Sequence, residues 1–434
     1  MDINNILSVL KDNILPAFGC TDPVTPALAA SIAYHKAGLG TVQDIALIVS
    51  NDIYKGAYSV IVPGSNRKGI AFAAALGIAC GNPDNGLMVL EACNEQSIIA
   101  ADEILKTADI HVTPDSAKGE IYVELSISTS NGNAKVIFNG RHDCYNYLEV
   151  NGVVLENKGP IENNYVDENV KAIPKTMEGL CNVVEQLNEE DLSFIDEGIK
   201  MNSAASQKGL QYNYGLAVAK RLKEVFSNEE FSAYISTKIA ACAASDARMG
   251  GCSVPVMSVF GSGNQGALIF CSISQLGQIQ NTPKIRVLRA ITLASLIAGL
   301  FNHVLADGTP FCDCALVAST AASAGMTYLL NGTPQQMENA AQMTISSMAG
   351  LLCDGAKANC AQRISSGVGT ALENAFLALN TKASITPDGI LGETYIDSCK
   401  NVCRIGAAIR VTVEENIVDI LKNKKLKEGD RDWI

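Results

Sequence analysis

The thiols best placed to do chemistry lie in two short segments, residues 311–314 (Phe-Cys-Asp-Cys) and residues 353–360 (Cys-Asp-Gly-Ala-Lys-Ala-Asn-Cys). On one continuous helix, Cys353 and Cys360 would be separated by roughly 10 Å, which is too far for one compact metal centre. Asp354 and Gly355 break such a helix and allow both thiols to fold inward. The pattern therefore indicates a loop that gathers thiolates around a metal.

Three interpretations fit the four thiols of these segments, Cys312, Cys314, Cys353 and Cys360. Tetrahedral zinc is one, but its usual short C-x-x-C knuckles are absent here. An iron–sulfur cluster accepts thiolates at wider and less regular spacings. Buried thiols without any metal are the third interpretation.

A further cysteine, Cys20, stands in the proline-bounded turn Gly19-Cys20-Thr21-Asp22-Pro23, directly before a predicted helix. A helix N-terminus lowers the pKa of a thiol toward the reactive range, so Cys20 is a candidate base or nucleophile, with an inert thiol as the alternative. The four histidines do not pair at ligand spacing. Only His142 lies in a loop between two predicted strands, where it could meet a ligand or remain an ordinary surface histidine.

Residues 261–266 match the dinucleotide-binding pattern G-x-G-x-x-G. No acidic residue follows about twenty positions later, and no βαβ alternation surrounds the segment, so context argues against a nucleotide site. We interpret it as a tight turn whose amides, at Gly263, Asn264 and Gln265, could cradle a carboxylate, with a purely structural turn as the alternative.

A second candidate anion site is the loop 63–69, which contains Ser65 and Asn66 and precedes a helix. Free amides and a helix N-terminus could again hold a carboxylate, although a plain strand-to-helix connection fits equally well. Asp246 and Arg248 stand beside paired glycines, and we expect them to form a structural ion pair.

Composition excludes several classes of protein. Of the 434 residues, 47% are apolar and 18% are charged, which is typical of a globular chain. The net charge of -12 and the lack of a basic run with aromatics argue against nucleic acid as a partner. The apolar run 290–306 contains polar residues and is short for a bilayer, so we expect a buried core helix and no membrane partner.

The compartment follows from the N-terminus and the cysteines. The first residues lack the basic stretch and small-residue cleavage site of a signal peptide. Fourteen cysteines are too dilute for a disulfide scaffold in a chain of this length. We therefore expect a cytoplasmic protein whose cysteines serve packing, metal binding or catalysis.

Periodicity predicts an α+β fold. Helices over residues 3–15 and 27–37 precede strands at 45–49, 59–62, 121–128, 134–138 and 145–150, with a polar turn at 51–52 and hairpin turns at 131–132 and 151–152. Later helices are predicted at 178–186, 216–225, 231–244, 285–305, 315–330, 334–348 and 367–379. We expect a mixed α/β N-terminal module followed by a large, mainly α-helical domain, divided as 1–38, 39–160 and 161–434.

Several segments together resemble the L-cysteine desulfidase family, which is related to the iron–sulfur-dependent serine dehydratases. The resemblance rests on residues 16–23, 62–65 leading to 73–77, 140–142, 243–251, 261–266, 311–312 and 353–360. The chain departs from the family pattern at Asp22, Asn66 and Asp143, and an extra residue near Cys314 leaves the upstream ligand open. Cys312 is favoured because the matching family position follows a bulky apolar residue.

The resemblance implies a [4Fe-4S] cluster on Cys312, Cys353 and Cys360, carried by the helical domain. It also implies a small amino-acid substrate, L-cysteine, with Cys20 as the base that removes the α-proton and with Ser65, Asn66, His142, Gly263, Asn264 and Gln265 around the substrate. We expect β-elimination to sulfide, ammonia and pyruvate, and a homodimer. L-Serine dehydratase is the alternative within this chemistry.

Outside iron–sulfur chemistry, the alternatives are an NAD-dependent oxidoreductase using residues 261–266, a zinc-stabilised protein without catalysis, and a pyridoxal phosphate enzyme. Against the last, no lysine stands at a strand end beside a phosphate loop, and Lys357 is poorly placed for a Schiff base.

Overall fold

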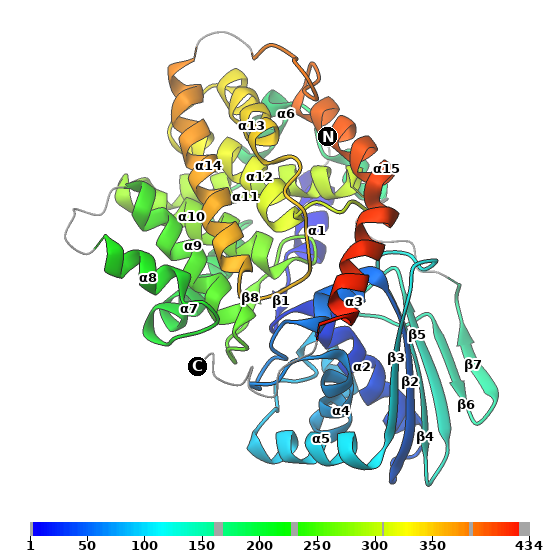
Figure 1. Cartoon of the computed structure of the whole chain (residues 1–434). Coiled ribbons are helices and arrows are strands. Elements are labelled where there is room, and N and C mark those ends of the chain that lie inside the picture. The colour runs from blue at the N-terminus through cyan, green and yellow to red at the C-terminus, as the bar shows by residue number, and fades with distance from the viewer. Residues whose placement is uncertain (1–2, 160–167, 227–232, 306–307, 382–384, 425–434) are drawn as a thin grey trace.

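The computed structural model describes residues 3–159, 168–226, 233–305, 308–381 and 385–424. It confirms the predicted fold class: a mixed sheet with helices on one side stands below a large helical body (Figure 1). Separate apolar cores fill the two parts. The predicted domain boundary at residue 160 lies outside the described residues.

A six-stranded sheet in the order β3-β2-β4-β5-β6-β7 forms the smaller part, and β1 pairs separately with β8. The strands are β1 (Pro16–Ala17), β2 (Val42–Ser50), β3 (Asp109–Asp115), β4 (Tyr122–Thr129), β5 (Asn133–Asn139), β6 (Tyr147–Val150), β7 (Val153–Asn157) and β8 (Val256–Met257). Only β2 and β3 pair in parallel; the other neighbours are antiparallel.

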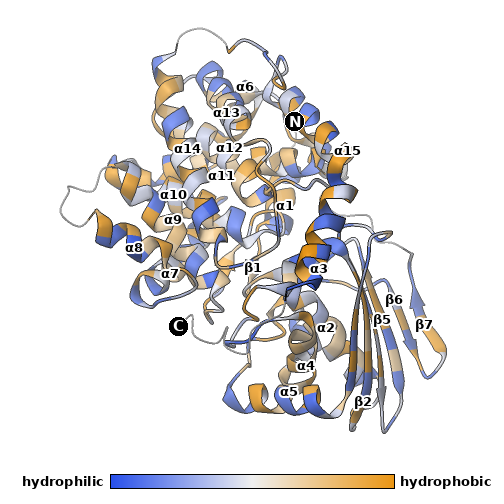
Figure 2. Cartoon of the chain, in the orientation of Figure 1, coloured by the Kyte–Doolittle hydropathy of each residue, from blue (hydrophilic) through white to orange (hydrophobic). Residues whose placement is uncertain are grey.

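Both predicted hairpins form. Asn151 and Gly152 join β6 to β7 with φ angles of 51° and 79°, as a two-residue hairpin turn requires. Buried and partly buried residues alternate along β4, and the strands are striped orange and blue in Figure 2. Helices cover one face of the sheet, and the opposite face is turned toward solvent.

The helices of the smaller part are α2 (Thr21–Lys36), α3 (Asn51–Tyr58), α4 (Ile70–Cys80) and α5 (Glu95–Thr107), with a 3-10 turn at Pro83–Met88. The helical body contains α1 (Ile3–Asn13), a 3-10 turn at Glu168–Ala172, α6 (Met177–Val184), α7 (Ser193–Gln211), α8 (Val218–Val225), α9 (Ala233–Met249), α10 (Gly263–Ile279), α11 (Lys284–Val304), α12 (Asp313–Leu329), α13 (Pro334–Met348), α14 (Cys360–Asn380) and α15 (Tyr395–Lys422).

Helix α11 explains the long apolar run. It is the one helix of the described residues that is long and apolar enough to cross a membrane, yet 78% of its apolar window is buried inside the molecule. Helices pack around it on several sides in Figure 1. This is the burial of a core helix, as the sequence predicts.

Two local predictions are wrong. The polar turn predicted at 51–52 is the start of α3, because the Ser50 hydroxyl accepts the Ile53 amide at 3.3 Å and caps a helix there. The strand predicted at 59–62 is reduced to a single bridge between Ile61 and Lys68. In addition, α1 packs in the helical core whereas α2 packs against the sheet, so the segment 1–38 is shared between the two cores.

Helix α15 returns from the helical body to the smaller part. In Figure 1 it runs down the molecule and ends beside α3. Arg410 binds Asp52 at 2.7 Å, and Glu414 binds Lys55 at 3.3 Å. These ion pairs, of which Lys55–Glu414 is buried and Arg410–Asp52 partly buried, join the two parts next to the cysteine loops described below.

Candidate active site

Three cysteines stand at helix starts. Cys20 is the N-cap of α2, Cys312 is the N-cap of α12, and Cys360 is the first residue of α14. The first amides of a helix lack intrahelical acceptors and carry partial positive charge. Each position therefore favours an anionic ligand or a thiolate.

The two cysteine loops predicted from the sequence pair with each other. Phe311 and Leu352 form an antiparallel bridge. The amide of Cys312 donates to the Leu351 carbonyl at 2.7 Å, and the amide of Cys353 donates to the Pro310 carbonyl at 2.7 Å. The bridge brings the thiols of Cys312 and Cys353 within hydrogen-bonding reach of one another.

The segment between Cys353 and Cys360 is a loop, as predicted, and α14 begins only at Cys360. Gly355 has a φ of +99°, and a Cβ there would lie 2.1 Å from the carbonyl oxygen of Lys55. Only glycine allows this loop to approach α3 so closely. Asp354 binds Arg363 at 2.5 Å and also pairs with Lys357.

Cys20 reaches the same region from the N-terminal part. The pairing of β1 with β8 aligns Pro16 with Met257, which ties the Cys20 turn to the connection between α9 and α10. Cys20 is buried, and its thiol donates to the Asp22 carboxylate at 3.5 Å. It belongs to a small cluster with Cys360, so the candidate base and a candidate ligand are neighbours.

A cavity of about 230 Å³ between the two parts of the molecule brings these groups together. We call it the thiol cavity. Its cysteines are Cys20, Cys312, Cys314, Cys353 and Cys360. Its charged or amide-bearing side chains are Asp22, Asp52, Lys55, Glu120, His142, Arg248, Asn264, Gln265, Asn302, Asp313 and Arg363.

Burial opposes ionisation of the thiols. It raises the pKa of Cys20, with Asp22 adding to the effect and Arg248 acting against it. The lowering expected from the helix start is thus outweighed. A hydrogen bond that the Cys312 thiol donates to Cys314, together with burial, raises the pKa of Cys312 to about 12, and burial raises that of Cys360 to about 11.

The donor set fits an iron–sulfur cluster. Cys312, Cys353 and Cys360 offer sulfur alone, and a bound metal deprotonates coordinating thiols that burial otherwise keeps neutral. Lys55 lies close enough to act on the charge of Cys353, and Arg363 on that of Cys312. These cations would offset the negative charge of a thiolate-bound cluster.

The thiols are not spaced for a single ion. Within the described ranges, the group whose ligand atoms all lie within 4.8 Å of one another is Asp44, Asp109 and His111, on the sheet. That group is largely exposed and no other observation points to a metal there. The cysteine spacing therefore argues for a larger, multi-iron group over zinc.

His142 lines the thiol cavity, and its Nδ1 lies 2.8 Å from the Thr25 hydroxyl of α2. Burial lowers the pKa of His142, while the neighbouring Asp22 acts in the opposite direction. The structure thus places the predicted histidine in the wall of the thiol cavity, near Asp22.

The glycine turn at 261–266 also lies at the cavity. The short strand β8 that precedes it pairs antiparallel with β1, so the βαβ context of a dinucleotide site is missing there. Asn264 and Gln265 line the cavity. Gly263 lies behind them, where a Cβ would stand 2.3 Å from Nε of Arg248.

The loop with Ser65 and Asn66 borders the Cys20 turn, because a Cβ at Gly19 would lie 2.0 Å from Pro63. The Ser65 hydroxyl donates to the Val62 carbonyl at 2.8 Å, and Asn66 is exposed. Neither residue lines the thiol cavity. The Ser65 amide donates to the same Val62 carbonyl at 3.1 Å, which closes a local turn.

Sequence reasoning missed several cavity residues. Arg248 was expected to pair with Asp246, but the Asp246 carboxylate accepts the Ala219 amide at 2.9 Å and caps α8 instead. Asp313, between two cysteines, has a buried Oδ1 that finds no hydrogen-bond partner among the described residues. Burial raises the pKa of Asp313 to about 7 and that of Glu120 to about 8. The position of Asp313 inside the cysteine motif was the one available signal.

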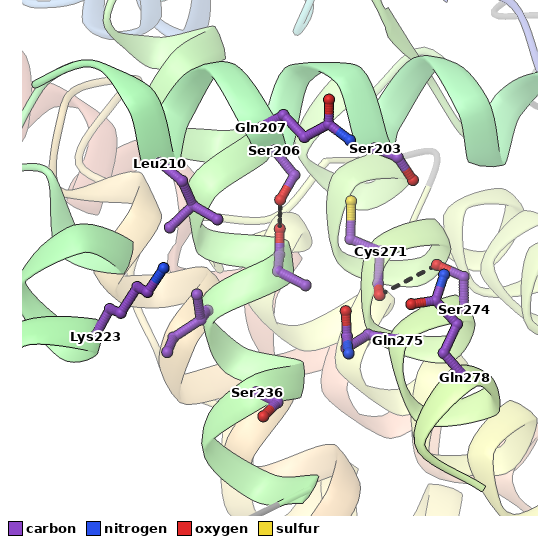
Figure 3. Close-up of a pocket in the computed structure, with 12 residues that line it drawn as sticks. Ser203, Ser206, Gln207, Leu210, Lys223, Ser236, Cys271, Ser274, Gln275 and Gln278 are labelled. Atoms are coloured by element: carbon purple, nitrogen blue, oxygen red, sulfur yellow. Dashed lines mark hydrogen bonds between the residues drawn. The ribbon is translucent and has the colours of Figure 1, made fainter. Parts of the chain in front are cut away.

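A second, larger cavity of about 430 Å³ lies among α7, α8, α9 and α10 (Figure 3). Its lining is mostly serine and glutamine, and Cys271 is its single cysteine. Ser206 donates to the Ala240 carbonyl at 2.8 Å, so part of this polarity is already satisfied. Volume does not select the site, because a third cavity, lined in part by residues 347–351, reaches about 700 Å³. The reactive groups converge on the thiol cavity.

Comparison with known proteins gives the class and the family. The model of the family "Serine dehydratase alpha chain" matches residues 84–419. A UPF0597 protein of Caldanaerobacter subterraneus subsp. tengcongensis is 33% identical over 98% of this chain and 99% of its own. UPF0597 proteins of Clostridioides difficile and Kosmotoga olearia are 31% and 32% identical, over 96% and 95% of this chain and 99% and 97% of theirs.

The family match points to a dehydratase-like lyase. The chain belongs to the serine dehydratase alpha-chain family, whose members typically depend on iron–sulfur centres.

Proposed function

We propose that this protein is a [4Fe-4S]-dependent L-cysteine desulfidase that converts L-cysteine to sulfide, ammonia and pyruvate. The observation that carries the proposal is the convergence of Cys312, Cys353 and Cys360 on one buried cavity that also contains Cys20. Cytoplasmic residence agrees with this chemistry, because a reducing compartment keeps such thiols free.

A cluster held by Cys312, Cys353 and Cys360 would supply, when bound, a Lewis acid that stabilises the departing sulfur of the substrate. Cys314 also lines the cavity and contacts Ser262 at 3.7 Å. We assign the third ligand to Cys312 because it is the thiol within reach of Cys353.

Cys20 removes the α-proton in this proposal. Its thiolate takes the proton from Cα, the released electron pair forms the Cα–Cβ double bond, and the Cβ–S bond breaks. The sulfur leaves as sulfide, and the resulting aminoacrylate tautomerises to an imine that water hydrolyses to pyruvate and ammonia. Helix α2 and Arg248 place positive charge near Cys20 in support of its thiolate.

L-Serine dehydratase is the second candidate, favoured by the description of the matching family. The two substrates differ in one β-atom, so the residues of the cavity serve both reactions. A thiolate leaves more readily than hydroxide and binds iron more readily, which favours L-cysteine.

The deciding experiment uses protein purified without oxygen. Broad visible absorbance, with iron and acid-labile sulfide in the chain, is expected together with release of sulfide and pyruvate in equal amounts from L-cysteine. The values of kcat/KM for L-cysteine and L-serine are then compared. A higher value for L-serine replaces the first candidate by the second, and a colourless protein inert toward both substrates refutes the proposal.

A further inference from the structure

The thiol cavity contains one cation without an anion. Among the described residues that line it, Lys55 binds Asp52 and Glu414, and Arg363 binds Asp354. Arg248 has no carboxylate within salt-bridge distance in the part of the chain that the structure describes, because Asp246 has turned to cap α8. The guanidinium of Arg248 is therefore available to pair with a bound anion.

Arg248 is deeply buried at the end of α9, with only 5% of its surface exposed. Its one described hydrogen bond runs from Nη1 to the thioether sulfur of Met249 at 3.3 Å, and its Nε has no partner in the described structure. A thioether is a weak acceptor, so most of the five donors of the guanidinium remain available. An unpaired buried charge is costly, which marks Arg248 as half of an incomplete pair.

The surrounding backbone is shaped to admit this side chain. Gly263 opens α10 directly behind Arg248, where any Cβ would stand 2.3 Å from Nε. Asn264, the next residue, donates instead to Met249 at 3.4 Å. The glycine turn thus makes room for the guanidinium, in addition to offering the amides of a helix start.

Arg248 also lies near the reacting groups. Its charge acts to lower the pKa of Cys20, of Asp22 and of Cys360. An anion bound at Arg248 would therefore stand between the candidate base and the candidate cluster ligand. A carboxylate is planar and matches the fork of a guanidinium, with two parallel hydrogen bonds.

We propose that Arg248 binds the α-carboxylate of an amino-acid substrate in the thiol cavity. This assignment rests on the proposed β-elimination for the identity of the substrate, but it concerns binding and not turnover. Held there, the carboxylate fixes one end of the substrate and directs Cα toward Cys20. It differs from the sequence-based interpretation, in which the amides of the loops at Ser65 and at 261–266 hold the carboxylate.

Calorimetry on the anaerobically purified holoenzyme tests the proposal with two unreactive probes, L-alanine and L-alaninamide, which differ in the carboxylate. Wild type should bind L-alanine more tightly. Arg248→Gln should weaken L-alanine binding by roughly 10- to 100-fold, the loss expected for a charge-assisted pair, and leave L-alaninamide within about twofold. Arg248→Lys should fall between, because it keeps the charge without the fork.

Two further variants separate loss of the Arg248 contact from a general effect of mutation. Gly263→Ala keeps the guanidinium but crowds Nε, and it should lower the preference for L-alanine. Arg404→Gln, an exposed change on α15, should have no effect. Iron content and the far-ultraviolet circular dichroism spectrum show whether each variant retains its cluster and fold.

Wild type that binds L-alanine no better than L-alaninamide, or that binds neither, overturns the proposal. So does Arg248→Gln that retains the preference. A wild type that prefers L-alanine, loses that preference on Arg248→Gln and yet turns over neither L-cysteine nor L-serine refutes the proposed function and leaves the carboxylate site standing.

Discussion

Cys20 is subject to opposing influences on its ionisation. The start of α2 favours a thiolate, whereas burial and Asp22 raise its pKa. The thiol also hydrogen-bonds Asp22 at 3.5 Å, so a carboxylate stands ready to accept or relay its proton. Asp22 is itself partly buried, and desolvation raises its pKa while His142 acts to lower it. Cys20, Asp22 and His142 thus form one coupled group.

Replacing Cys20 by alanine separates proton transfer from metal binding. Cys20→Ala should keep its iron and still bind L-cysteine, but lose turnover by a factor on the order of 10² or more, as for removal of a positioned general base. Exchange of the substrate α-hydrogen with deuterated solvent, followed by NMR, should also vanish. Turnover near the wild-type rate would move the base to another residue, with His142 the next to test, and loss of iron would make Cys20 a ligand.

Replacing Cys353 or Cys360 by serine tests the ligands themselves. Either change should remove iron and activity together, because a three-thiolate site that loses one ligand does not retain the cluster. Iron and acid-labile sulfide per chain are the measurements. Cys271→Ser is the control: Cys271 is buried, as Cys360 is, but lies in the other cavity, and it should keep full iron.

The ambiguity at the upstream ligand is resolved by the same assay. Cys312→Ser should lose the cluster and Cys314→Ser should keep it, because Cys312 is the thiol beside Cys353. The reverse result moves the ligand by two residues.

At the scale of elements, the regular spacing of apolar residues predicts helices and strands well. The helix predicted at 334–348 is α13 with the same bounds, and both hairpin turns form where Asn-Gly stands. The starts of the helices that carry the site are harder to predict from the sequence. α14 begins at Cys360, seven residues before its apolar pattern was recognised, because a thiol, a glutamine and an arginine open it.

The cavity itself depends on contacts between distant segments. The approach of the Gly355 loop to α3 and the capping of α8 by Asp246 are tertiary contacts, and local sequence patterns carry no signal for them. For the same reason, Arg248 was assigned to its neighbour Asp246 and not to a ligand.

Gly355 provides a test of how the cysteine loop is held. Gly355→Ala would strain a residue with φ of +99° and drive its methyl group to 2.1 Å from the Lys55 carbonyl oxygen. Relief of that clash displaces the loop from α3 at a cost of roughly 1–3 kcal/mol, so iron retention should fall sharply. Iron content after anaerobic purification is the measurement.

Gly350→Ala is the matched control for this change. Gly350 has a similar φ of +97°, but a Cβ there meets nothing within 4 Å. It carries the backbone strain alone, of about 1–2 kcal/mol, and should keep its iron. Equal iron in the two variants would show that the contact with Lys55 does not position the loop.

At the scale of the whole molecule, the site exists only where two separately packed cores meet. Cys20 comes from the smaller part, and Cys312, Cys353 and Cys360 come from the helical body. The ion pairs of α15 with α3 hold this junction, since Arg410 binds Asp52 and Glu414 binds Lys55. Lys55 also lines the thiol cavity, so the same residues serve assembly and the site.

Removing Arg410 tests that coupling. Burial acts to raise the pKa of Asp52, but Lys55 and Arg410 outweigh it and hold the pKa below its ordinary value. A carboxyl of this kind stabilises the fold above its unfolded pKa, and the contribution is lost as the pH falls through its folded pKa. Arg410→Gln should therefore cost about 3 kcal/mol at neutral pH, the range for breaking a buried pair, and less as Asp52 becomes protonated in acid.

Urea denaturation across this pH range gives the stability, and hydrogen exchange should speed up in α3 and α15 before it does so in either core. Arg404→Gln, on the same helix but exposed, should stay within about 0.5 kcal/mol of wild type. If α3 and α15 exchange in Arg410→Gln as slowly as in wild type, the junction is held by apolar packing, and the ion pairs serve the charge of the thiol cavity instead.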